Sequence, residues 1–138
     1  MRQPAALTNK GMVLRDIGRY EEALDLFNKA LKQDNNYANA WMEKGSTLHR
    51  LGKYDVALQS LDMALDINPL YAAAWESKGN ILYQTGKYEK ALYCFDRATE
   101  IEPINKPAWC KKVESLKVLG REEEARAAMA TSERYACG

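Results

Sequence analysis

Pairs of glycines recur along the chain at a fixed interval, and this interval constrains the fold more than any other feature. The two glycines of a pair stand seven residues apart, and the pair repeats every 34 residues, at Gly11 and Gly18, Gly45 and Gly52, and Gly79 and Gly86. A tyrosine and two alanines follow each pair at constant offsets. A short unit that repeats in this way indicates stacked supersecondary pieces. Such stacks form extended binding surfaces more readily than catalytic pockets.

Each unit shows helix periodicity in two consecutive segments. In the second unit, small and apolar residues return every three to four positions, at Ala40, Trp41, Gly45 and Leu48 and then at Tyr54, Ala57, Leu61, Ala64 and Leu65. Gly52 lies between the segments, and glycine is the residue that most easily takes the left-handed conformation that closes a helix. We therefore predict eight helices, over 5–17, 20–33, 38–51, 54–67, 72–85, 88–101, 106–119 and 122–135.

The first glycine of each pair falls inside a predicted helix, where it costs about 1 kcal/mol relative to alanine. Its recurrence therefore needs a structural reason. A missing side chain allows a close approach, and we expect the small partner to be the alanine on the paired helix, at Ala23, Ala57 or Ala91. The large rings are expected to fill the wider spaces between helix pairs, namely Trp41, Trp75, Trp109, Tyr54, Tyr88, Phe27 and Phe95.

The order and spacing of these residues resemble the tetratricopeptide repeat (TPR). The third unit carries the full pattern, at Trp75, Gly79, Leu82, Gly86, Tyr88, Ala91, Phe95, Ala98 and Pro103. The resemblance runs from about Pro4 to Tyr135 and implies an all-α fold, a right-handed superhelical α-solenoid of stacked helix-turn-helix repeats. We expect a single TPR domain over 1–138, with repeats at about 4–37, 38–71, 72–105 and 106–138.

The last repeat departs from the pattern and is expected to cap the array. Val113 replaces the first glycine, Glu122 the tyrosine and Met129 the aromatic residue. A terminal unit of a stack has one neighbour instead of two, so such replacements are expected there. They leave open whether the predicted helix 122–135 packs as firmly as the others.

The bulk properties exclude several classes of function. Lys and Arg number 20 against 19 Asp and Glu, with no basic cluster, so we expect no nucleic-acid partner. No signal peptide or membrane span is recognisable, and a cytoplasmic protein without a membrane partner is the expectation. The odd count of 3 cysteines suits a reducing compartment, with Cys94 and Cys110 as small apolar helix residues and Cys137 as an exposed thiol.

Residues for catalysis are nearly absent. His49 is the only histidine, and no motif places a nucleophile with it. Gly52-Lys53 resembles the end of a phosphate-binding loop, but the spacing from the preceding glycine is wrong and tyrosine follows the lysine. No cluster has metal-ligand spacing. We predict a protein that is not an enzyme and that uses no cofactor or metal.

Function is therefore expected on the surface that the repeats create. In the family that the chain resembles, the first helix of each unit lines the concave face. By register, the predicted partner-binding residues are Asn9, Met12, Arg15, Asn39, Met42, Glu43, Ser46, His49, Arg50, Glu76, Asn80, Tyr83, Gln84, Lys111 and Lys117. Amides, charges and adaptable methionines suit an extended or helical peptide. The alternative is that these positions are merely solvated.

One binding mode of the family does not fit. Some members hold the C-terminal carboxylate of chaperones with a clamp of Lys, Asn and Arg on three successive first helices. The clamp positions here hold Thr8, Met12, Glu43, Ala73 and Ser77 or, one unit later, Met42, Ser46, Ser77, Pro107 and Lys111. We therefore expect no chaperone-tail partner. The leading hypothesis is a scaffold or adaptor that binds a protein segment. The alternatives are a self-associating, homo-oligomeric module and the accessory fragment of a larger protein.

Overall fold

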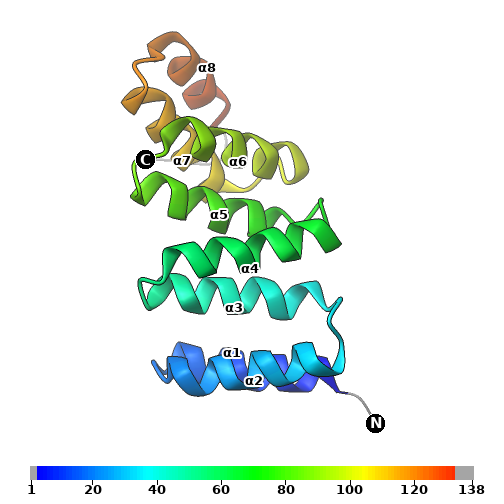
Figure 1. Cartoon of the computed structure of the whole chain (residues 1–138). Helices are drawn as coiled ribbons and strands as arrows, with labels where there is room; N and C mark the ends of the chain where they lie inside the picture. Colours follow the sequence, from blue (N-terminus) through cyan, green and yellow to red (C-terminus); the bar gives the residue numbers. More distant parts are fainter. Residues whose placement is uncertain (1–2, 133–138) are drawn as a thin grey trace. The chain divides into compact units, whose positions relative to one another are not determined.

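The structure is a computed structural model that describes residues 3–132 (Figure 1). All regular structure in that range is helical, in α1 (Pro4–Asp16), α2 (Tyr20–Gln33), α3 (Ala38–Arg50), α4 (Tyr54–Ile67), α5 (Ala72–Gln84), α6 (Tyr88–Ile101), α7 (Lys106–Val118) and α8 (Glu122–Ser132). The all-α helical repeat fold is confirmed, and the bounds of the first seven helices lie within one residue of those predicted. For the last predicted helix, 133–135 lie outside the described residues.

The chain divides into two compact units, Met1–Pro69 and Leu70–Gly138. The first unit holds α1 to α4 and the second α5 to α8, so each contains two helix-turn-helix repeats. Inside a unit, the two helices of a repeat pack together, and the second helix of one repeat packs on the first helix of the next. The first helices also touch, α1 with α3 and α5 with α7. We call the surface made by these two first helices the first-helix face of a unit.

The turn inside each repeat takes the left-handed conformation that was predicted. The angle φ is positive at every turn glycine, +85° at Gly18, +75° at Gly52, +80° at Gly86 and +75° at Gly120. The Gly52 N–H donates to the carbonyl of His49 at 2.9 Å, and the Lys53 N–H donates to the carbonyl of Leu48 at 2.9 Å. The same two bonds recur at the other three turns. Because they satisfy the last helical carbonyls, the helix ends at the glycine.

The atoms nearest to the glycines inside the first helices belong to large side chains. A Cβ added to Gly11, Gly45 or Gly79 would lie 2.6, 2.8 or 2.7 Å from Phe27, Leu61 or Phe95. At Gly45 the Ala57 carbonyl oxygen also lies at 3.1 Å, so the expected approach of an alanine is found there. At Gly11 and Gly79 the nearest neighbour is a phenylalanine ring and not the expected alanine. The missing side chain makes room for a buried ring or leucine within the same repeat, which the small-residue pattern alone did not indicate.

The other large rings are less buried than expected. Phe27 and Phe95 are fully buried, but Trp41, Trp75 and Trp109 are only half-buried. Tyr54 is 36% exposed, so its assignment to the core is wrong. The tryptophan and tyrosine rings lie at the edges of the core and do not fill it, because their N–H or O–H group requires a hydrogen-bond partner or solvent.

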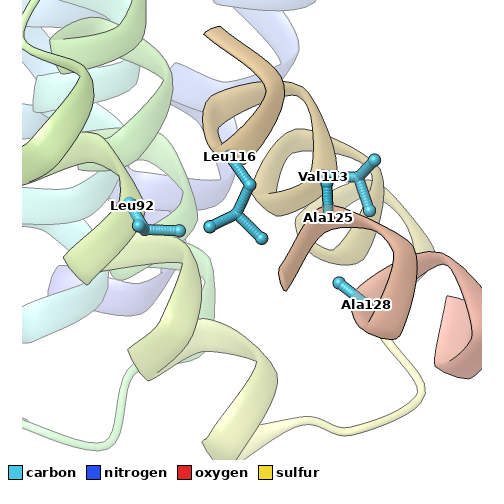
Figure 2. Packing of buried hydrophobic residues seen from close by; sticks show 5 residues of the cluster. All are labelled: Leu92, Val113, Leu116, Ala125 and Ala128. Carbon is cyan, nitrogen blue, oxygen red and sulfur yellow. The ribbon is translucent and has the colours of Figure 1, made fainter. Parts of the chain in front are cut away.

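The fourth repeat fills its core in a different way. Leu92 of α6, Val113 and Leu116 of α7, and Ala125 and Ala128 of α8 form one buried cluster (Figure 2). Val113 stands where the other repeats have the inner glycine, and it is only 7% exposed. Its side chain is therefore part of the core in this repeat, whereas Gly79 leaves room for Phe95 in the third repeat. α8 packs on this core through Ala125 and Ala128.

Candidate binding surface

The predicted binding residues all lie on first helices, but they differ in exposure. Four are exposed, Asn9, Arg50, Gln84 and Lys117. Ten are half-buried, Met12, Arg15, Asn39, Met42, Ser46, His49, Glu76, Asn80, Tyr83 and Lys111. Glu43 is buried, with an exposed fraction of 5%, so its assignment to the exposed positions is wrong. Thr8, one of the residues at the clamp positions, is fully buried.

Glu43 is buried because it is paired across the first unit. Its carboxylate accepts a hydrogen bond from the Arg15 guanidinium, and the side chains are 6% and 12% exposed. Arg15 lies on α1 and Glu43 on α3, so the ion pair joins the two first helices. Removing either partner would leave a buried charge uncompensated. The pair therefore serves the packing of this face and is not free to bind a ligand.

The second unit has a different pair at the same place. Tyr83 of α5 and Lys111 of α7 are 28 residues apart, as are Arg15 and Glu43. The Lys111 ammonium lies 5.2 Å from the centre of the Tyr83 ring, which is a cation–π geometry. Tyr88 packs its edge on the same ring with centroids 5.2 Å apart. The first helices of this unit are thus joined by an aromatic ring and a cation that both remain partly accessible.

A second link in this unit engages Glu76. The Asn105 side chain caps α7, where its Oδ1 accepts from the Ala108 N–H at 3.2 Å. The Nδ2 of the same side chain donates to Glu76 Oε2 at 3.0 Å. This arrangement holds the Glu76 carboxylate at the start of α7, so Glu76 has part of its hydrogen-bonding capacity already used.

Asn80 differs from Glu76 because its amide oxygen has no protein donor. Asn80 Oδ1 is buried and has no hydrogen-bond partner among the described residues. An unsatisfied buried acceptor costs about 1–3 kcal/mol. Reorientation of this side chain toward a ligand would therefore sacrifice no internal hydrogen bond.

In the first unit, His49 of α3 lies near Tyr54, with ring centroids 5.7 Å apart.

Sequence reasoning could not separate the paired residues from the accessible ones. The exposed and paired positions share one register on the first helices, and only the contact across helices distinguishes them. The available signal was the 28-residue separation of Arg15 and Glu43, which is six residues short of the repeat and brings opposite charges to facing positions. That signal becomes readable only once the packing of successive first helices is known.

No group of His, Cys, Asp and Glu that could hold a metal ion occurs in residues 3–132. No helix there is long and apolar enough to cross a membrane. Cys94 is a buried free thiol, as expected. Cys110 is half-buried on α7. Cys137 lies outside the described residues.

Solved structures share this fold. The chain is similar to MamA, with a TM-score of 0.89 and 22% identity over 97% of this chain and 78% of that one. It is similar to YrrB, described as a TPR protein with an unusual peptide-binding site, with a TM-score of 0.85 and 22% identity over 97% and 69%. The first TPR of Spaghetti (RPAP3), bound to an HSP90 peptide, matches with a TM-score of 0.81 and 26% identity over 85% and 93%.

The sequence comparisons agree with the structural ones. No curated protein matches the chain in sequence. Two family models described as tetratricopeptide repeat do match, one over residues 8–72 and the other over residues 72–105. Together they cover the first three repeats that the 34-residue interval defines. The chain therefore belongs to the tetratricopeptide repeat family.

Proposed function

We propose that the chain is a non-enzymatic scaffold or adaptor that binds a peptide segment of another protein on its first-helix faces. The observation that carries this proposal is the contrast between repeated and unrepeated positions. Inner and turn glycines recur in register because packing requires them. The accessible positions on the same helices do not recur. Positions that are free of packing constraints can specialise for a ligand.

The chemistry of the accessible residues fits a peptide. Met12 and Met42 are half-buried on the first unit, and methionine adapts its shape to an irregular apolar surface. Arg50 is exposed at the end of α3 and has a guanidinium suited to carbonyls and carboxylates. Asn80 and Tyr83 supply an amide and a ring on the second unit. Two similar solved structures, those of YrrB and of the first TPR of Spaghetti (RPAP3), are described with peptides or peptide sites.

A chaperone tail remains a poor candidate for the partner. Of the clamp positions, Thr8 is fully buried and Glu43 is buried in its pair with Arg15. Neither can donate a hydrogen bond from a free cation or amide to a terminal carboxylate. The peptide that we propose must therefore be held by other residues of the first-helix faces.

The test is a paired substitution on these faces. Arg50→Glu with Tyr83→Ala should reduce capture of the partner from a lysate of the source cell by about tenfold, an effect of about 1.4 kcal/mol. The matched control is Lys53→Glu with Tyr93→Ala, which makes the same changes of charge and size at exposed residues outside the first helices. Circular dichroism should show equal helicity in both variants.

Protection mapping completes the test. Hydrogen exchange on the captured complex should show slowed exchange in α1 and α3 or in α5 and α7. Equal capture by the Arg50 and Tyr83 variant and by its control would contradict the proposal. Light scattering over a wide concentration range addresses self-association, because a concentration-dependent increase in mass would indicate that a second copy of the chain is the partner.

A further inference from the structure

A surface pocket lies in the first unit, where α2 meets α3, outside the set of residues predicted to bind a partner. Its volume is about 580 Å³, and Leu31 and Trp41 supply its apolar part. Leu31 is 8% exposed and belongs to the core beneath the pocket, against which Trp41 packs. The pocket therefore has a rigid apolar floor. We call it the outer pocket.

The wall of the outer pocket is basic. Lys29 and Lys32 of α2 and Lys44 of α3 line it, with Asp25 as the only acidic residue in the lining. None of the three lysines makes an ion pair with any described residue. The Lys44 ammonium lies 5.3 Å from the centre of the Trp41 ring. Three lysines thus line a pocket that contains one aromatic ring and a single carboxylate.

The second unit shows the same junction with its charges neutralised. Adding two repeats, 68 residues, to Trp41 and Lys44 gives Trp109 and Lys112, whose ammonium also lies over the ring, at 4.8 Å. There Lys112 pairs with Asp96 at 3.0 Å. Asp96 stands at the position of Asn28 in the first unit.

A second cation of that junction is also neutralised. Arg97, at the position of Lys29, pairs with Glu100 at 2.9 Å. Glu100 stands at the position of Lys32, so a carboxylate in the second unit is a third lysine in the first. The two junctions share their ring and their inner lysine, and they differ in whether the chain provides the anions.

The unneutralised charge is also partly desolvated. Burial beside Trp41 lowers the pKa of the Lys44 ammonium, because removal from water disfavours the charged form. A carboxylate arriving from outside would offset this penalty and form charge-assisted hydrogen bonds. The side chains of Asn28 and Asn35 in the lining offer additional amide donors.

We propose that the outer pocket binds an acidic segment of a partner protein, with carboxylates held by Lys29, Lys32 and Lys44 and an apolar side chain lying against Trp41. The bound carboxylates take the place that Asp96 and Glu100 occupy in the second unit. This site uses none of the residues that were predicted to bind a partner on the first-helix faces, and it does not depend on them. It gives the chain a second docking surface of defined chemistry.

The test uses a fluorescent synthetic peptide in which glutamates flank one leucine. A peptide with glutamine at each glutamate serves as the neutral probe. By fluorescence anisotropy at low salt, the acidic peptide should bind at least about tenfold more tightly than the neutral one, and added salt should weaken it because exposed charges are screened. Lys32→Glu, which introduces the carboxylate of the second unit, should weaken binding of the acidic peptide by about tenfold.

Matched variants make the result specific to this site. Lys53→Glu changes the net charge equally at an exposed residue of the same unit and should leave the affinity unchanged. Asn28→Asp is a nearly isosteric change that supplies the counterpart of Asp96, and it should also weaken binding. Thermal unfolding should confirm that all three variants remain folded.

Several outcomes would overturn the proposal. Equal loss with Lys32→Glu and Lys53→Glu would mean that only net charge matters. Loss with the Arg50→Glu and Tyr83→Ala variant would place the probe on the first-helix faces. Tighter binding of a single-stranded oligonucleotide than of the acidic peptide would assign the pocket to nucleic acid. These results can be distinguished from a failure of the scaffold proposal, because that proposal is tested only by partner capture with the Arg50→Glu and Tyr83→Ala variant.

Discussion

The two units of the chain place the same kinds of residue at the junction between their repeats but treat charge differently. In the second unit, Lys112 and Arg97 each face a carboxylate of the chain. In the first unit, the corresponding Lys44 and Lys29 form no ion pair with any described residue, and a further lysine lies at 32, with Asp25 as the one carboxylate in the pocket lining. The difference shows that the repeat fixes which residues pack and leaves the local charge balance free. A junction that the chain does not neutralise is available to a partner.

On the first-helix faces, it is the first unit that pairs its charges internally. The first unit buries an ion pair there, between Arg15 and Glu43. The second unit uses a partly exposed ring and cation, Tyr83 and Lys111, at the same register. The pair of the first unit is thus almost fully buried, whereas Lys111 in the second unit stays partly exposed and also pairs with Glu114 at 3.3 Å. Four sets of substitutions test the differences in pairing and in core packing between corresponding positions of the repeats.

The largest effect is expected from the buried ion pair. Arg15→Met leaves the Glu43 carboxylate buried without its partner and should lower the free energy of unfolding by about 3 kcal/mol. Arg15→Tyr with Glu43→Lys installs the pair of the second unit and should recover most of that loss. Urea denaturation followed by circular dichroism measures both. A double variant no more stable than Arg15→Met would show that the two pairs are not interchangeable.

The inner glycine should give the next largest effect. Gly79→Val places a Cβ 2.7 Å from the Phe95 ring and should cost about 2 kcal/mol through overpacking. Adding Phe95→Met reproduces the Val and Met combination of the fourth repeat and should restore about half of the loss. The same denaturation experiment applies. If the added substitution instead lowered stability further, the core of the fourth repeat would not be explained by exchange of volume.

A smaller effect is expected for the cation over the ring. Lys111→Met keeps the length of the side chain and removes its charge, and it should destabilise the second unit by about 0.5–1 kcal/mol. Lys117→Met, on the same helix at an exposed position, serves as the control and should change stability by less. Comparable losses in the two variants would indicate that the contact with Tyr83 contributes nothing of its own.

The smallest effect concerns the pH dependence of the outer pocket. Burial lowers the pKa of Lys44, so the charged form costs stability below that pKa, and the cost disappears as pH rises from it through the higher pKa of the unfolded chain. Asn28→Asp should raise the pKa of Lys44 and stabilise the chain by about 0.5 kcal/mol at neutral pH. The gain should vanish as the new carboxylate protonates near about pH 4. Nuclear magnetic resonance titration of the Lys44 ammonium checks the direction, and an unchanged pKa would contradict it.

The helices were predicted well because the same pattern of glycines and apolar residues recurs in three successive units. The turn glycines and the helical periodicity placed the bounds of α1 to α7 within one residue. The partner of the inner glycine was missed because Phe27 and Ala23 both recur on the facing helix, and only their side-chain directions decide which one lies over Gly11.

The functional surfaces were less predictable because they depend on contacts between repeats. The position of Glu43 within the repeat places it on the first-helix face. Its burial results from the ion pair with Arg15 of the preceding repeat, which the repeat pattern does not predict. The outer pocket was not predicted at all, since Lys29 and Lys32 read as solvated helix positions in isolation. The sequence difference that marks the pocket becomes visible when the sequences of the two units are aligned, because Asn28 and Lys32 stand at the positions of the anions Asp96 and Glu100.

The indole N–H resonances of Trp41 and Trp109 provide the most direct test of the difference between the units. The Trp41 Nε1–H donates to the Asn35 carbonyl at 2.9 Å, and the Trp109 Nε1–H donates to the Pro103 carbonyl at 2.7 Å, so the two reporters are equivalent at rest. When ¹⁵N-labelled protein is titrated with the acidic peptide, the Trp41 signal should shift and saturate while the Trp109 signal stays fixed. Equal shifts at both indoles, or a fixed Trp41 signal under conditions where anisotropy reports binding, would contradict the assignment of the outer pocket.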